Sequence, residues 1–110
     1  MTSIDDYQVK IGEQLGFLDI PMLFLNAGYA EIGAFDELPP SEIERQVTVN
    51  ALQPIYLAKV LLKQIKGRKE RSAIVVTSSV AAVRPMPGGG TYSATKSFAS
   101  YIAEAWSWEL

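Results

Sequence analysis

A long amphipathic pattern between two short apolar runs constrains the fold of this chain most strongly. The two runs cover residues 22–25 and 73–77, and both are short enough to be buried strands. Between them, apolar residues recur at helical spacing from about residue 41 to residue 66. A strand, a long helix and a second strand form a crossover that places the strands in parallel. The sequence therefore predicts an α/β fold.

Further helices are predicted on either side of this unit. Residues 4–16 have apolar side chains at helical spacing, and another helix begins near Tyr92, after a loop rich in proline and glycine over residues 80–91. For the long helix, Ser41 is predicted as the N-cap, with Glu44 completing a capping box. Because two strands make a poor sheet, we expect residues 1–110 to be the central part of a single domain, truncated at both ends.

Composition excludes several kinds of function. The chain has 110 residues, 48% of them hydrophobic, and contains neither cysteine nor histidine. A disulfide framework, a thiolate metal site and a serine triad with a histidine base are therefore excluded, and no metal site is predicted. The net charge of −2 gives no reason to expect nucleic acid as a partner. No apolar run reaches the roughly 18 residues of a membrane span, and the first residues lack a signal-peptide pattern.

Tyr92 and Lys96 are the first candidates for chemistry. They lie four residues apart at the start of a predicted helix, so their side chains share one face. A tyrosine ordinarily has a pKa of roughly 10, and a nearby cation favours the phenolate and lowers that value. Tyr92 is thus a candidate general acid or base, and Ser79, after the second strand, is a candidate partner.

Asn50 stands out because of the proline four residues later. Pro54 has no amide hydrogen to donate to the carbonyl of Asn50, so that carbonyl is left free and the helix should bend there. A free carbonyl inside a domain needs a water or a side chain. An ordinary packing kink remains the alternative.

Other readings of the same residues stay open. Tyr92 and Lys96 could belong to an amphipathic helix start without chemistry, because such spacings are common. Ser79 and Lys96 could instead form the nucleophile and base of a serine-lysine hydrolase.

Taken in order, these motifs resemble those of the short-chain dehydrogenase/reductase family, over nearly the whole chain. The similarity is greatest to the branch that holds hydroxysteroid dehydrogenases and very-long-chain 3-oxoacyl-CoA reductases. Four motifs occur in the family's order: Asn26-Ala27-Gly28 after a strand, then Asn50, then Ser79, and last the Tyr-x-x-x-Lys motif of Tyr92 and Lys96.

The resemblance implies a Rossmann-like, doubly wound parallel sheet and a hydride transfer between NAD or NADP and a carbonyl or secondary alcohol of a steroid, lipid or fatty-acyl type. It implies four catalytic residues, Tyr92, Lys96, Ser79 and Asn50, the last holding a proton-relay water through its main chain. It also implies that Asn26, Ala27 and Gly28, with Tyr92 and Lys96, contact the cofactor.

The family pattern is incomplete in these residues. The Gly-rich loop that binds the cofactor pyrophosphate is absent, as is the residue that separates NAD from NADP. We therefore expect residues 1–110 alone to be inactive, and a non-catalytic, dimerising paralogue is a further alternative. The resemblance implies a homodimer through helices 42–66 and 92–110, in the cytoplasm or at the endoplasmic reticulum.

Overall fold

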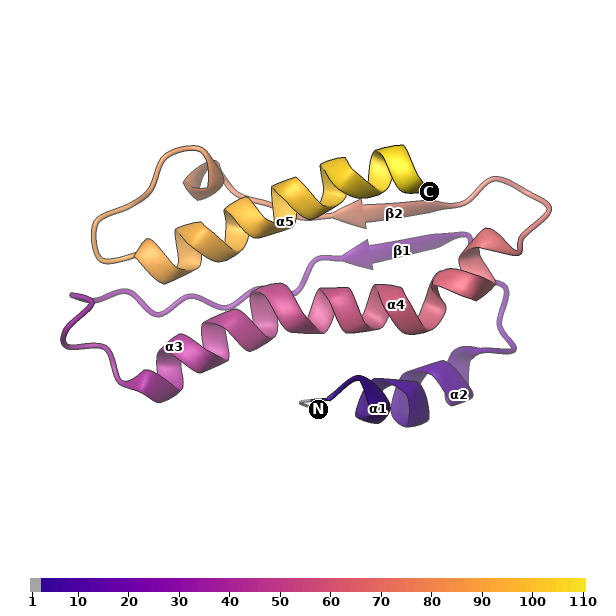
Figure 1. Cartoon of the computed structure of the whole chain (residues 1–110), viewed down its shortest axis with the longest axis horizontal. Helices are drawn as coiled ribbons and strands as arrows, with labels where there is room; N and C mark the ends of the chain where they lie inside the picture. The colour runs from indigo at the N-terminus through magenta and orange to yellow at the C-terminus, as the bar shows by residue number, and fades with distance from the viewer. Residues whose placement is uncertain (1–2) are drawn as a thin grey trace.

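A computed structural model describes residues 3–110 of the chain and contains a two-stranded parallel sheet. Strand β1 (Met22–Leu25) pairs with β2 (Ala73–Val76), and Leu23 lies opposite Ile74. Figure 1 shows the two strands side by side and pointing the same way. The predicted α/β fold with a parallel sheet is confirmed, and the strand bounds agree to within one residue.

The helices fall into three groups along the chain. The predicted 4–16 helix consists of α1 (Ile4–Tyr7), the π-helical turn η1 (Gln8–Gly12) and α2 (Glu13–Leu15). The long connection between the strands consists of α3 (Pro40–Val47), the π-helical turn η2 (Thr48–Leu52) and α4 (Gln53–Lys66). After β2 come a short 3-10 turn, η3 (Val80–Ala82), and the long helix α5 (Gly90–Glu109).

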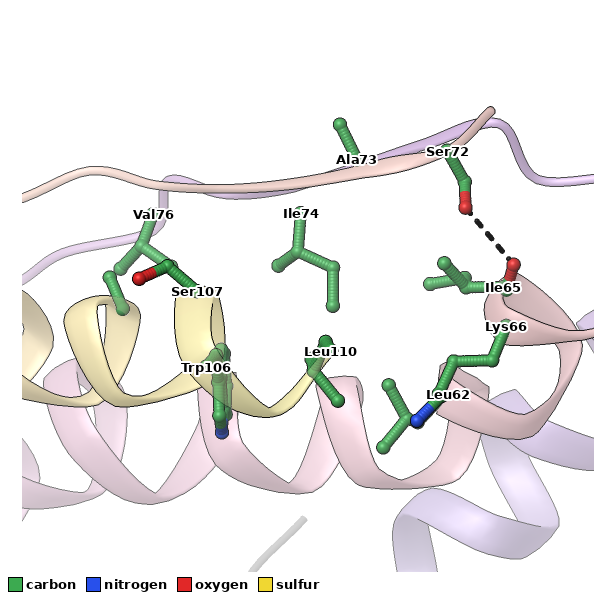
Figure 2. A pocket seen from close by; sticks show the side chains of 11 residues that line it. Leu62, Ile65, Lys66, Ser72, Ala73, Ile74, Val76, Trp106, Ser107 and Leu110 are labelled. Carbon is green, nitrogen blue, oxygen red and sulfur yellow. Dashed lines mark hydrogen bonds between the residues drawn. The ribbon is translucent and has the colours of Figure 1, made fainter. Parts of the chain in front are cut away.

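The described helices cover one face of the sheet. Leu23 and Leu25 of β1 are buried, whereas the intervening Met22 and Phe24 are 50% and 60% exposed, as the alternation of side chains along a strand requires. The buried pair packs against the apolar face of α4, in a cluster with Ala58, Leu61 and Ile65. In Figure 2 the helices lie together on one side of the strands.

The helix α3 begins differently from the prediction. Pro39 is the N-cap, and its carbonyl oxygen accepts hydrogen bonds from the N–H groups of Glu42 (2.9 Å) and Ile43 (3.4 Å). Pro40 is the first helical residue, where its missing N–H costs nothing and its fixed φ suits a helix. Ser41 therefore lies inside the first turn, and the predicted capping box with Glu44 is wrong.

The helix between the strands is interrupted just before Pro54. In η2 the N–H of Gln53 bonds to the carbonyl of Thr48, five residues back, so the helix widens for one turn. Proline favours such an interruption, because it has no N–H and its ring crowds the carbonyl four residues earlier. Figure 1 shows the helix axis changing direction between α3 and α4, as predicted from Pro54.

The predicted 80–91 loop is shorter than expected at both ends. Ser79 caps η3 by accepting a hydrogen bond from the N–H of Ala81, so the chain turns as soon as it leaves β2. At the other end, α5 already begins at Gly90, because the N–H of Ser93 donates to the carbonyl of Gly89 at 2.9 Å. Tyr92 and Lys96 therefore lie in the first two turns of α5.

A cavity of about 410 Å³ opens between α4, β2 and the end of α5 (Figure 2). The side chains that line it are mainly apolar, Trp106 and Leu110 among them, and Ser72 beside it donates a hydrogen bond to the carbonyl of Ile65 at 3.1 Å. None of the predicted site residues lines this cavity. Within residues 3–110, no helix has the length and apolar character needed to cross a membrane.

Candidate active site

The carboxyl ends of the two strands carry the polar residues of the candidate site. Asn26 follows β1 and Thr77 follows β2, and the hydroxyl of Thr77 donates to Oδ1 of Asn26 at 2.8 Å. The N–H of Thr77 also donates to the carbonyl of Leu25 at 3.1 Å, so the two strand ends are joined twice. In open α/β sheets, the crevice outside the carboxyl ends of the strands is where ligands bind.

Lys96 reaches this edge from α5. Its side chain is 5% exposed, and Nζ donates a hydrogen bond to the carbonyl of Thr77 at 3.2 Å. The same nitrogen lies over the ring of Tyr92, 5.7 Å from its centroid. The predicted pairing of a tyrosine and a lysine on one helical face is therefore present, and the cation is held beside the ring at the end of β2.

Gly28 lies directly against the lysine. A Cβ atom at this position would lie 3.3 Å from Nζ of Lys96 and 3.8 Å from Oδ1 of Asn50. The absence of a side chain at Gly28 thus lets the loop after β1 approach the ammonium closely.

The two serines after β2 have different surroundings. The hydroxyl of Ser78 donates to the carbonyl of Lys96 at 2.9 Å and lies 2.6 Å from the hydroxyl of Ser100, so Ser78 fastens α5 to β2. Ser79 accepts from Ala81 at 3.2 Å. In the described part of the chain, no hydrogen bond uses the hydroxyl hydrogen of Ser79, which leaves Ser79 able to donate to a ligand.

Asn50 uses its side chain in a way that the sequence did not predict. It is 3% exposed, and its Oδ1 accepts from the N–H of Tyr29 while its Nδ2 donates to the carbonyl of Tyr29, both at 2.8 Å. Nδ2 also donates to the hydroxyl of Thr95 at 3.0 Å. Asn50 thereby joins η2, the loop after β1 and α5. A polar residue within the apolar stripe of the long helix was the available signal, because a buried amide must find partners.

Tyr29 was not predicted as part of the site at all. Its hydroxyl donates to Oε2 of Glu42 at 2.6 Å, and the guanidinium of Arg45 lies over its ring, 4.1 Å from the centroid. The hydrogen bond to Glu42 is the main cause that raises the pKa of Tyr29 to about 12. No local pattern could have revealed these contacts, since Glu42 is thirteen residues away in the chain.

The structure brings the predicted residues together unequally. Lys96 contacts the end of β2, the ring of Tyr92 and the surroundings of Gly28, and Asn50 anchors the same region. Among residues 3–110, no hydrogen bond joins Ser79 to Tyr92 or to Lys96, so a serine-lysine hydrolase pair has no support. What the fold and the site define is a parallel α/β domain with a tyrosine and a lysine at the carboxyl ends of its strands.

Comparison with known proteins identifies the family of this chain. The family model described as short chain dehydrogenase matches residues 1–110, and the chain belongs to this family. It is 30% identical to an NADPH-dependent 3-dehydrocapnine reductase from Ornithobacterium rhinotracheale, covering 98% of this chain and 39% of that protein. It is also 30% identical to a very-long-chain 3-oxoacyl-CoA reductase from Pyricularia oryzae, covering 96% of this chain and 32% of that protein. The family predicted from the sequence motifs is confirmed.

Solved structures agree with this assignment. A short-chain dehydrogenase/reductase from Brucella melitensis superposes with a TM-score of 0.83 at 29% identity, over 98% of this chain and 45% of that one. An alcohol dehydrogenase from Thermococcus sibiricus, complexed with 5-hydroxy-NADP, superposes with a TM-score of 0.79 at 27% identity, over 97% of this chain and 44% of that one. The chain therefore spans less than half the length of these relatives.

Proposed function

We propose that the protein interconverts a carbonyl compound and a secondary alcohol, with NAD or NADP as the hydride carrier. The observation that carries the proposal is the placement of Lys96, whose buried Nζ lies over the ring of Tyr92 at the carboxyl end of β2. This arrangement places a positive charge beside the ring whose hydroxyl would exchange the proton with the substrate. Family membership supports the same chemistry.

Each of the four residues then has a defined task. Tyr92 gives or takes the proton at the substrate oxygen, and Lys96 stabilises the charge that Tyr92 carries. The free hydroxyl hydrogen of Ser79 is available to the substrate oxygen and would stabilise its developing charge. The main-chain carbonyl of Asn50, which has no amide partner at Pro54, would hold a relay water, while its amide side chain holds the loop after β1.

The residues at the strand ends fit a nicotinamide cofactor. Asn26, Ala27 and Gly28 present small or polar groups there, and Gly28 lies close to Nζ of Lys96. Lys96 would bind the ribose hydroxyls, and Tyr92 would lie beside them. When bound, the cofactor supplies the hydride, and the protein supplies orientation and the proton. One relative is an NADPH-dependent reductase and one similar structure holds an NADP derivative, which supports this choice.

The substrate class that we propose is a lipid-like or fatty-acyl carbonyl compound. Two very-long-chain 3-oxoacyl-CoA reductases, from Pyricularia oryzae and Neurospora crassa, are 30% and 32% identical to this chain. The matches to both reductases cover 32% of their length, and we propose that residues 1–110 are the central part of a single cofactor-binding domain.

We further propose that two copies associate through the helices at 42–66 and 92–110. Phe98, Tyr101 and Trp108 of α5 are 42%, 75% and 85% exposed, so this helix carries large apolar groups on its outer surface. Sedimentation velocity should show a dimer that Tyr101→Asp converts to a monomer. A monomer for the unaltered protein would contradict this association.

The decisive experiment is Tyr92→Phe in the enzyme expressed from its complete coding sequence. Oxidation of NADH or NADPH would be followed with a panel of aliphatic, steroid and 3-oxoacyl carbonyl compounds. The variant should lose turnover and keep its thermal midpoint, because only the proton donor is removed. Ser79→Ala should lower kcat by about 10²–10³, as the loss of one oxyanion donor does.

Tyr56→Phe is the matched control for the tyrosine variant. Tyr56 lies in α4, where its ring centroid is 5.6 Å from that of Tyr7. Its hydroxyl has no hydrogen bond in the described residues. This control should keep full activity. If the Tyr92→Phe variant retained most of the activity, the assigned mechanism would be wrong.

A further inference from the structure

Tyr29 is held on three sides although it belongs to a loop. Its main chain is bonded at both N–H and carbonyl by the side chain of Asn50, each at 2.8 Å. Its hydroxyl donates to Glu42 at 2.6 Å, with Glu31 as a second and longer acceptor at 3.2 Å. Its ring lies under the guanidinium of Arg45.

The side-chain contacts all lead to α3 or to the loop itself. Glu42 and Arg45 are three residues apart in α3, so both reach the same side of that helix. The carboxylate holds the hydroxyl and the guanidinium holds the ring face, which fixes both the position and the tilt of Tyr29. The loop after β1 is thereby fastened to α3 independently of the bonds that Asn50 makes.

The loop fixed in this way carries Gly28 to the ammonium of Lys96. Gly28 immediately precedes Tyr29, and a Cβ at Gly28 would lie 3.3 Å from Nζ. The position of this loop therefore determines how much space remains beside the ammonium. Among residues 3–110, the side chain of Lys96 donates one hydrogen bond, to the carbonyl of Thr77, so the nearness of Gly28 is a further restraint on the position of Nζ.

We propose that Tyr29 is a positioning residue that, through Gly28, fixes the ammonium of Lys96 relative to Tyr92. Its role in turnover rests on the proposed function, whereas its effect on the position of Lys96 does not. Tyr29 does not touch the reacting atoms. It acts by holding the loop against α3, and the carboxylate of Glu42 is its essential partner.

The first test measures the position of Lys96 without any turnover. Trace acetylation followed by mass spectrometry reports how accessible each lysine amine is, with the exposed Lys59 as an internal reference. In Tyr29→Phe the ring stays under Arg45 but the hydroxyl is lost, and acetylation of Lys96 relative to Lys59 should rise several-fold. Glu42→Gln should produce a smaller rise, because a neutral acceptor holds the hydroxyl more weakly. Tyr56→Phe should leave the ratio unchanged.

The second test measures turnover in the enzyme from the complete coding sequence. Tyr29→Phe should lower kcat on the order of tenfold with little change in KM for the carbonyl compound, because a misplacement of about 1 Å costs up to about 100-fold. A general loss of folding would instead lower the thermal midpoint and expose other buried residues to labelling.

The two tests separate the two proposals. A rise in Lys96 labelling in a protein that reduces no carbonyl compound would support the positioning of Lys96 and contradict the proposed activity. Unchanged labelling together with unchanged kcat in an active enzyme would overturn the role of Tyr29 and leave the proposed activity intact.

Discussion

A single missing side chain, that of Gly28, controls how closely the loop after β1 approaches Lys96. In Gly28→Ala the new methyl group would lie 3.3 Å from Nζ, a distance at which the flexible lysine end must move by a few tenths of an ångström. Gly28 does not have a positive φ, so alanine is compatible with its backbone. We expect the free energy of unfolding to change by less than about 1 kcal/mol, as measured by urea denaturation.

The activity of Gly28→Ala should respond much more than its stability. Displacement of the ammonium should lower kcat by about 10- to 100-fold in the enzyme from the complete coding sequence. Steady-state kinetics beside the denaturation curves would check both expectations. If the variant unfolded early but turned over normally once folded, Gly28 would be a residue of the fold and not of the site.

Tyr29 also makes stability depend on pH in the alkaline range. Its pKa is raised from 10.0 to about 12, first by the hydrogen bond to Glu42 and then by burial. The neutral phenol is therefore favoured in the folded state. Its contribution to the free energy of unfolding is fully present below pH 10 and is lost as the pH rises through about 12. Burial also raises the pKa of Tyr7, so Tyr7 adds a further loss of stability at alkaline pH.

Tyr29→Phe should remove part of this alkaline loss. Denaturation curves taken from neutral pH to about pH 12 should fall less steeply for the variant than for the unaltered protein. The contribution of Tyr7 is common to both proteins and cancels in the comparison. Parallel curves above pH 10 would mean that Glu42 does not hold the phenol in solution.

Among the elements, the helix between the strands is interrupted by the π-helical turn η2, just before Pro54. Pro54→Ala supplies an N–H for the carbonyl of Asn50, so the π-helical turn should close to a regular α-helix. Proline inside a helix costs about 3 kcal/mol relative to alanine, so the variant should be more stable by up to about that amount. Chemical denaturation measures the gain, and slow hydrogen exchange at the new amide would show that the bond forms.

The same substitution should lower turnover if the Asn50 carbonyl serves a relay water. Once the carbonyl is bonded to residue 54, it is a poorer acceptor for water. A variant that is more stable and equally active would contradict the relay and leave Pro54 as a feature of packing. A variant with an unprotected amide at residue 54 would show that η2 is set by the surrounding packing and not by proline.

For the whole molecule, we expect cofactor affinity to depend on residues outside the described strand ends. Under the proposed function, residues 1–110 would supply groups for the nicotinamide ribose, but they contain no Gly-rich loop for the pyrophosphate. Isothermal titration of this chain with NADH and NADPH should therefore show no binding at sub-millimolar cofactor. A dissociation constant near 1 µM, equivalent to about −8 kcal/mol, would mean that these residues form a sufficient cofactor site by themselves.

The parts of the fold that could be predicted are those encoded by neighbouring residues. The two strands and the three helical segments follow from runs and periods of apolar side chains, and the interruption before Pro54 follows from the chemistry of one residue. Tyr92 and Lys96 also form a local pair, because four residues make about one helical turn. The start of α3 was missed because Pro40 competes with Ser41 for the first turn, and sequence alone does not decide between them.

What only the tertiary structure decided is how residues far apart in the chain meet. Asn50 bonds Tyr29 and Thr95, which are 21 and 45 residues away, and Lys96 bonds the carbonyl of Thr77, 19 residues away. These contacts depend on the pairing of β1 with β2 and on the packing of α5 beside the strand ends. The sequence by itself determined the segments and the identity of the candidate site residues. Their distances were settled by packing, because a buried amide or ammonium takes whichever partner the folded backbone brings within reach.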